Sequence, residues 1–274
     1  MRWHRRPSER QARTPGRSRT ITLLGLLALL VTSAGIARAE LSQSGNIRVA
    51  FDGGIVPNEL PRNRLAPVAV SVSGEIKNLR GPLPPRVKHI SIQVNRHGRL
   101  FDKGLPACPR KRLANSTTSM ALRRCGRALV GRGQMRSAIA LPDQAPLPSK
   151  GKITIFKGKP RGGKRVLLAH TYGKKPAPTT YVFVFTMRKT RGTYGTRLTT
   201  TVPRLSSNWG YLSYFAFRLK RRYHHRGRRV SYLSASCPAP NGFPRATFPL
   251  SRVQYRFEGG RRVSSTLIRS CRVR

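Results

Sequence analysis

Apolar residues alternate with polar ones along most of the chain, which is the pattern of half-buried β-strands. In the clearest case, at 89–94, Ile90, Ile92 and Val94 share one face. Comparable runs predict strands at 46–51, 68–76, 135–141, 152–157, 165–172, 180–188, 196–202, 211–220, 229–237, 252–257 and 262–271. Their regular spacing, without helical periodicity between them, predicts an antiparallel all-β fold, either a sandwich or a meander.

One short helix is predicted to interrupt this pattern after residues 115–118, whose polar side chains can cap its N-terminus. Leu122, Cys125 and Leu129 recur at helical spacing, so we expect them on one apolar face, with the cysteine turned inward. The segment GKKPAP at 173–178 is the best candidate for a linker. It either divides the region into two β domains or forms a long turn within one.

The last two predicted strands carry apolar residues at odd-numbered positions, namely Val253, Tyr255, Phe257, Val263 and Leu267. A two-residue loop at 259–260 would place the two sets on opposite faces, whereas an odd loop that includes Glu258 keeps them together. Cys271 has the same parity, and Cys237 alternates with apolar residues on an earlier strand. We therefore expect an odd loop, and a bond between these two cysteines is geometrically sensible.

The first 39 residues have the three parts of a cleavable secretory signal. Arginines precede an apolar run at 21–31, and Ala37-Arg38-Ala39 forms a small-residue cleavage site before Glu40. The run is shorter than the roughly 20 residues of a membrane-spanning helix, which favours cleavage over an uncleaved anchor. We therefore expect residues 40–274 to be secreted or extracytoplasmic, associated with the cell envelope, and to contact the membrane only through the segment before cleavage.

Four cysteines, an even number in an exported chain, favour disulfide bonds. Local pairing would join Cys108 to Cys125 and Cys237 to Cys271. Each bond would close a loop that contributes about 3 to 4 kcal/mol in the chain-entropy model. No C-x-x-C pair is present, so the spacing argues against a metal site, and we expect neither a metal nor a cofactor.

Charge narrows the range of partners more than any motif does. The chain has 55 Lys and Arg residues against 8 Asp and Glu residues. Eight of the basic and one of the acidic residues precede Glu40, which leaves a net charge of about +40 on the rest. A G+C-rich genome raises the arginine content, but it does not explain the scarcity of acids, whose codons are also G+C-rich. A surface this cationic attracts polyanions and repels copies of itself.

The densest cluster of cations lies in a predicted hairpin at 220–229. Its candidate polyanion-binding residues are Lys220, Arg221, Arg222, Tyr223, Arg226, Arg228 and Arg229. With Trp209 and Tyr211 upstream, the segment has the basic and aromatic composition that binds polyanions. The alternative is a solvated loop whose charges repel one another, since charge runs are common and aromatic residues on strands usually serve the core. His224-His225 lies in the same segment and lacks a third metal ligand.

No catalytic constellation stands out in the sequence. Residues 158–165 match a phosphate-binding loop except at the last position, and their strand-like continuation predicts a hairpin turn instead. The segment 266–271 is faintly similar to the active-site strand of sortases, but an inward cysteine with a partner is ordinarily a disulfide. His170 and Asp143 lack the nucleophile elbow of a serine hydrolase, and the acidic residues never pair closely enough in sequence to predict a glycosidase.

Three segments resemble a family of uncharacterised exported β-rich proteins of high-G+C soil bacteria. They read LPDQAPLPSKGKITIFKG (141–158), CPAPNGFP (237–244) and SSTLIRSCRVR (264–274). The resemblance runs from about residue 87 to the C-terminus and implies an exported β-rich protein. It carries over no activity, ligand or catalytic residue.

Together these observations predict an exported, disulfide-stabilised, non-enzymatic all-β protein that associates with anionic polymers of the cell envelope or matrix. The expected partner is a wall polymer, an acidic polysaccharide or extracellular nucleic acid. Two other classes stay open: an envelope hydrolase or transpeptidase with unidentified catalytic residues, and a structural or adhesion module whose charge is incidental. A concave pocket with clustered His and carboxylates would indicate the enzyme, and an unbroken cationic face would indicate the binder.

Overall fold

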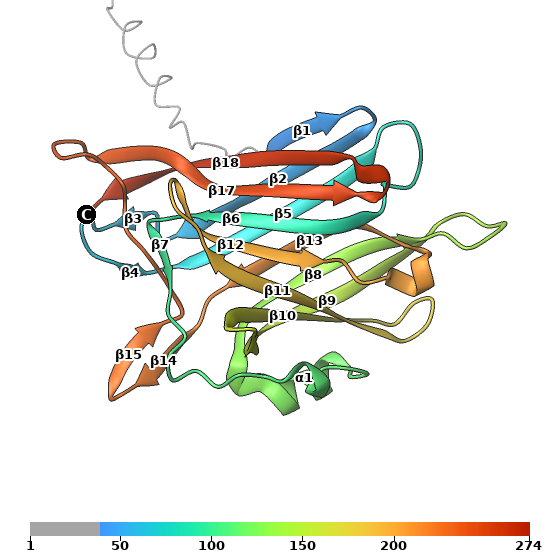
Figure 1. Cartoon of the computed structure of the whole chain (residues 1–274), viewed down its shortest axis with the longest axis horizontal. Coiled ribbons are helices and arrows are strands. Elements are labelled where there is room, and N and C mark those ends of the chain that lie inside the picture. Colours follow the sequence, from blue (N-terminus) through green and yellow to red (C-terminus); the bar gives the residue numbers. More distant parts are fainter. Residues whose placement is uncertain (1–38) are drawn as a thin grey trace, which may run out of the picture. The chain divides into compact units, whose positions relative to one another are not determined.

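The computed structural model describes residues 39–274, so the predicted signal segment lies, apart from its last residue, outside the described residues. The described chain forms one compact unit, and its one α-helix is α1 (Thr118–Cys125) among many strands (Figure 1). The prediction of an all-β fold with one short helix is confirmed. Within this part of the chain no helix has the length and apolarity needed to cross a membrane.

Thirteen strands form one continuous sheet. In the order in which they pair, they are β1 (Glu40–Ser44), β2 (Ile47–Val56), β5 (Ala69–Asn78), β13 (Gly210–Leu219), β8 (Leu129–Ile139), β9 (Leu147–Arg161), β10 (Lys164–Gly173), β11 (Thr179–Lys189), β12 (Tyr194–Thr201), β6 (Val87–Asn95), β17 (Arg245–Phe257), β18 (Arg262–Val273) and β3 (Glu59–Leu60). All neighbours are antiparallel except β18 and β3. The architecture is therefore one curled, mixed sheet rather than a plain sandwich.

Two small sheets and four short 3-10 turns complete the described structure. β4 (Ala66–Pro67), β16 (Leu233–Ala235) and β7 (Gly98–Leu100) pair in one small sheet, and β14 (Arg222–His225) and β15 (Arg228–Ser231) pair in the other. The 3-10 turns are η1 (Arg110–Arg112), η2 (Gly126–Ala128), η3 (Leu205–Asn208) and η4 (Glu258–Gly260).

The large sheet curls until β1 and β2 lie beside β18 (Figure 1). Ser265 Oγ donates to the Glu40 carbonyl over 3.4 Å, and Arg269 Nε donates to the Gly53 carbonyl over 2.8 Å. Arg269 also pairs with Asp52. These contacts all involve side chains, and among the described strands no backbone ladder joins β18 to β1 or β2.

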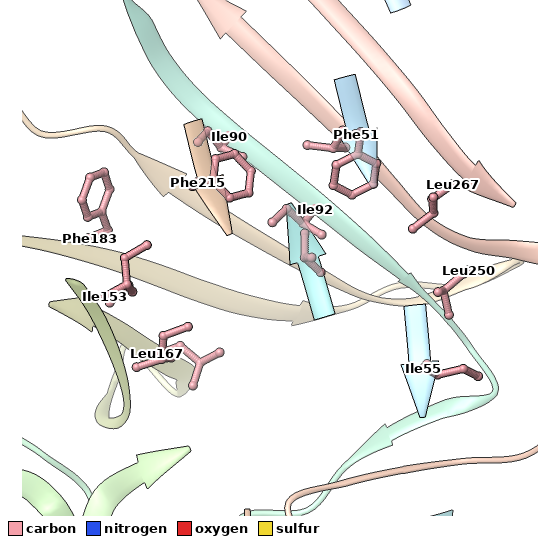
Figure 2. Close-up of a cluster of buried hydrophobic side chains, with 14 of the residues drawn as sticks. Phe51, Ile55, Ile90, Ile92, Ile153, Leu167, Phe183, Phe215, Leu250 and Leu267 are labelled. Atoms are coloured by element: carbon pink, nitrogen blue, oxygen red, sulfur yellow. The ribbon is translucent and has the colours of Figure 1, made fainter. Parts of the chain in front are cut away.

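Alternating strand positions turn apolar side chains toward the inside of the curl and build the main core. Figure 2 shows side chains from strands far apart in the sequence, including Phe51, Phe183, Phe215 and Leu250, gathered in this interior. Residues from nearly every strand of the large sheet contribute to one contiguous cluster. The curl is therefore closed by burial of its inner face as well as by the side-chain contacts at its edges.

The final hairpin has the predicted register. Its loop is η4, which contains Glu258, and Tyr255 pairs with Val263 across it. Val253 and Leu267 are buried with them on the inner face. β17 is longer than predicted, because the pairing with β18 continues past an irregularity within it.

A second, smaller core lies on the outer face of the sheet, between α1 and strands β9 and β10. Thr117 caps the helix, since its hydroxyl accepts a hydrogen bond from the Met120 backbone N–H over 3.2 Å. Ala121 and Cys125 are buried on the helix. Leu129 is not on the helix as predicted, because α1 ends at Cys125 and the turn η2 redirects the chain into β8.

Both predicted disulfides are present. Cys108 bonds to Cys125 with Cα atoms 5.5 Å apart, and Cys237 bonds to Cys271 with Cα atoms 5.7 Å apart. The first ties the loop before α1 to the helix, and the second ties the segment after β16 to β18. Two disulfides indicate an oxidising, extracytoplasmic location.

The segment 173–178 joins β10 to β11, and these strands pair along their whole length up to Gly173 and Thr179. It is therefore a hairpin turn within the continuous sheet. Residues 158–165 likewise cover the turn between β9 and β10, where Gly162 and Gly163 have positive φ. The hairpin prediction for this glycine-rich segment is confirmed.

Candidate polyanion-binding surface

Carboxylates are few in the described chain, and most of them are already paired. The acids in ion pairs are Asp52, Glu59, Glu75, Asp102 and Glu258, and their basic partners are Lys77, Arg86, Lys88, Arg165, Arg269 and Arg272. Hydrogen bonds from Lys88 and Arg86 lower the pKa of Glu258. Within residues 39–274 the other lysines and arginines have no carboxylate at ion-pair distance, so the surface keeps a strong positive potential.

The hairpin predicted to bind polyanions is formed by β14 and β15. Arg226 and Gly227 at its turn both have positive φ, which is the geometry of a type I′ turn. Its exposed basic side chains are Lys220, Arg222, His224, Arg226, Arg228 and Arg229. Cross-strand pairing sets His224 opposite Arg229 on one face, which Arg222 shares. Arg221 is only half-exposed.

The opposite face of this hairpin is anchored to the loop after β7. The Tyr223 hydroxyl donates to the Lys103 carbonyl over 2.9 Å and lies 3.2 Å from the Phe101 carbonyl. Burial, with the nearby carboxylate of Asp102, raises the pKa of Tyr223. The His225 ring centroid lies 5.9 Å from that of Phe101. Tyr223 therefore holds the hairpin in place and does not present a free ring.

Trp209 and Tyr211 lie at the far end of β13 from the hairpin. Ten residues of extended strand, rising about 3.3 Å each, separate the two places by roughly 30 Å. The Tyr211 hydroxyl accepts a hydrogen bond from Arg86 over 2.9 Å, and that guanidinium lies 4.8 Å from the Tyr211 ring centroid. The expectation that these aromatic residues join the hairpin in one site is wrong, because β13 runs unbroken between them.

A groove on the outer face of the sheet combines the residue types that the hairpin fails to bring together. Its floor belongs to β5, β13, β8 and β9, and its volume is about 530 Å³. Pro82, Pro84, Pro146 and Pro148 form part of its lining, and we name it the proline-lined groove. Its polar and aromatic lining residues include Glu75, Lys77, Arg136, Lys150, Ser213 and Tyr214.

Cross-strand pairing sets four of these residues in one row. Glu75 lies opposite Tyr214, Tyr214 opposite Arg136, and Arg136 opposite Lys150. The Arg136 guanidinium lies 4.1 Å from the Tyr214 ring centroid, and the Ser213 hydroxyl donates to the Arg136 carbonyl over 3.1 Å. Like charges at directly opposite strand positions destabilise a sheet unless an anion lies between them.

The groove contains little negative charge to offset this pair. Glu75 is the only carboxylate among its lining residues, and it lies 3.3 Å from Lys77. Arg136 and Lys150 form no ion pair with the described carboxylates. The two cations are therefore available to an anionic ligand.

A second cationic row crosses the outer face of β6, β17 and β18. His89 lies opposite Arg256, which lies opposite Arg262, and the three residues line a shallow depression of about 280 Å³. Burial and the positive charge of Arg256 lower the pKa of His89. The positive local potential therefore disfavours protonation of His89, as expected of a surface with few acids.

The candidate catalytic residues are not brought together. His170 is fully buried under α1, where its Nε2 lies 2.9 Å from the Ser116 carbonyl and its Nδ1 lies 3.3 Å from the Thr154 hydroxyl. Asp143 is exposed in a turn, and Cys271 is held in a disulfide. In the part of the chain that the structure describes, no group of three or more His, Cys, Asp or Glu residues is placed to hold a metal ion.

Sequence reasoning missed the proline-lined groove because its floor comes from four strands that are distant in the chain. The prolines at 82–85 and 146–148 were visible in the sequence, but nothing in either segment shows that they border the same groove. A comparison with protein-family models, curated proteins and solved structures finds no match.

Proposed function

We propose that the protein is an exported, non-enzymatic binder of anionic polymers of the cell envelope or matrix, and that the proline-lined groove is its main binding site. The observation that carries the proposal is the pair Arg136 and Lys150, two like charges on directly opposite strand positions without a free carboxylate between them. An anionic chain lying along the groove relieves their repulsion. It also releases the counterions that both partners hold when they are apart.

The environment of Tyr214 favours a polymer that is recognised by its charges. The Arg136 guanidinium already lies over the ring, 4.1 Å from its centroid, so one face of the ring is taken and is not offered to a nucleic-acid base for stacking. Tyr223 in the hairpin is also engaged, through its hydroxyl. These contacts favour an acidic polysaccharide or wall polymer over nucleic acid as the partner.

Export and envelope association belong to the same proposal. The disulfides require an oxidising compartment, and the net charge of about +40 beyond residue 39 suits a partner of high negative charge. Because the charges are carried by strands of a continuous, hydrogen-bonded sheet, they keep fixed spacings. A fixed array loses less entropy on binding than a flexible basic tail does.

Polygalacturonate, an anionic polysaccharide, tests the proposal in titration calorimetry at 50 and 200 mM salt, with neutral dextran as the control polymer. We expect binding of polygalacturonate alone, with an affinity that falls at least about tenfold over this salt range. The double variant Arg136→Gln with Lys150→Gln should weaken binding and flatten its salt dependence. The matched control, Arg222→Gln with Arg229→Gln, removes the same charge from the hairpin and should weaken polygalacturonate binding less.

Lack of binding at the lower salt concentration would contradict the proposed function. Equal losses in the two double variants would reject the groove as a site and leave only a diffuse attraction. A larger loss in the hairpin variant would move the site to β14 and β15. Thermal unfolding of each variant within a few degrees of the unchanged protein confirms that only the surface charge has been altered.

A further inference from the structure

The inside of the curled sheet contains space that its own side chains leave unfilled. Two adjoining cavities there have volumes of about 70 and 110 Å³. Every residue that lines the smaller one is apolar, and they include Ile90, Ile153, Phe183 and Phe215, which Figure 2 shows in the interior. Protein interiors are close-packed, with few voids larger than a water molecule, so this space is unusual for a core.

The two cavities adjoin each other across shared apolar side chains. They share the lining residues Ile92, Leu167, Leu198 and Leu219. An apolar cavity of about 150 Å³ admits benzene and stays free of water. Each cavity alone is smaller than this, whereas their volumes taken together exceed it.

The larger cavity changes character at the end that lies near the small sheet of β4, β16 and β7. Asn95, His97, Arg99 and Ser236 line it there, beside apolar residues such as Leu250. His97 Nδ1 lies 3.4 Å from the Ser236 hydroxyl, and Arg99 is exposed to solvent. The combined space therefore has an apolar end and a polar end.

We propose that the interior of the curled sheet binds a single alkyl chain, with the polar end of that molecule directed toward Arg99. A narrow apolar space with one polar end fits a single-chain amphiphile, and water gains no hydrogen-bond partner in the smaller cavity. This site is independent of the polyanion-binding groove. The two share no lining residue, and the groove lies on the outer face of the sheet.

Neutral probes are needed to test this site, because an anionic amphiphile would also bind the cationic surface. Primary alcohols of increasing length, from butanol to decanol, are therefore titrated and their binding followed by calorimetry. Burial of each further methylene group should raise the affinity about fourfold. The rise should stop once the chain fills the space, which distinguishes the interior from an open apolar surface.

Ala169 and Ala216 provide a matched pair of variants on two strands of the large sheet. Ala169 lines the smaller cavity from β10, so Ala169→Leu should fill it and lower the affinity for octanol at least tenfold. Ala216 lies on β13 opposite Gln134, on the outer face. Ala216→Leu adds the same volume outside the cavity and should leave octanol binding unchanged.

Leu198→Ala supplies a test of opposite sign where the two cavities meet. It should enlarge the space, so the affinity should continue to rise to longer alcohols than in the unchanged protein. Absence of saturable alcohol binding, or equal binding by Ala169→Leu and Ala216→Leu, would overturn the proposal. If Ala169→Leu fails to fold, Leu198→Ala decides, and an unchanged dependence on chain length overturns the proposal.

Discussion

Replacing both cysteines of one disulfide by alanine measures what each crosslink contributes to stability. The bond from Cys108 to Cys125 spans 17 residues, and the bond from Cys237 to Cys271 spans 34. Loop-closure entropy predicts that the free energy of unfolding falls by about 3 kcal/mol without the first and about 4 kcal/mol without the second. Alanine is the better replacement because all four cysteines are buried, and a serine hydroxyl there would add a desolvation cost.

The two losses should differ more in their location than in their size. Cys108 and Cys125 belong to the small outer core under α1, whereas Cys237 and Cys271 belong to the main core. Loss of the first bond should therefore release the amides of residues 105–128 while the large sheet stays protected. Loss of the second should weaken the whole sheet, because β18 forms the seam with β1 and β2.

Urea denaturation measures the size of each loss, and amide hydrogen exchange measures its location. A fall of less than about 1 kcal/mol for either pair would refute the loop-entropy reasoning. Loss of protection throughout the sheet when only Cys108 and Cys125 are replaced would refute the division into two cores. Each variant is compared with the unchanged, oxidised protein under the same conditions. The missing disulfide is then the only difference between the two samples.

Three further predictions concern pH, packing and processing. Burial lowers the pKa of His170 below its usual value of 6.5, so the unfolded chain protonates this histidine at a higher pH than the folded chain does. The free energy of unfolding should therefore fall as the pH drops below 6.5. His170→Asn should make the melting temperature less dependent on pH between pH 7 and 5. Gly74→Val should cost about 1 to 3 kcal/mol in urea denaturation, because its Cβ would lie 2.6 Å from the Phe215 ring, whereas Gly54→Val meets no atom within 4 Å. Intact mass should show that the exported chain begins at Glu40, and full-length protein in the membrane fraction would contradict this.

Parity along single strands predicted much of the local structure, although the strand expected at 229–237 is divided into β15 and β16. Ile90 and Ile92 face the interior as their alternation predicts, and the odd loop of the final hairpin follows from the parity of Tyr255 and Val263. The same reasoning predicted that Cys271 faces the interior, where it forms its disulfide with Cys237. These features depend on residues that are close in sequence, or on which face of a strand a residue occupies.

The order of the strands was not predictable in this way. β5 pairs with β13 across more than half of the chain, and no pattern within either strand identifies its partner. The row from Glu75 through Tyr214 and Arg136 to Lys150 exists only because of that order. The cations of the hairpin could be identified from the sequence because they are contiguous. The groove could not be identified, because its residues come together only when the order of four strands is known.

At the seam between β18 and β1, the backbone groups on the facing edges lie outside any ladder, apart from the last residues of β18, which pair with β3. Free sheet edges tend to pair with those of other molecules. Here the net charge of about +40 beyond residue 39 keeps copies apart over a screening distance of about 8 Å at physiological salt. The scarcity of acids therefore acts as a colloidal stabiliser, and any polymer that neutralises the surface also lowers the repulsion between neighbouring copies.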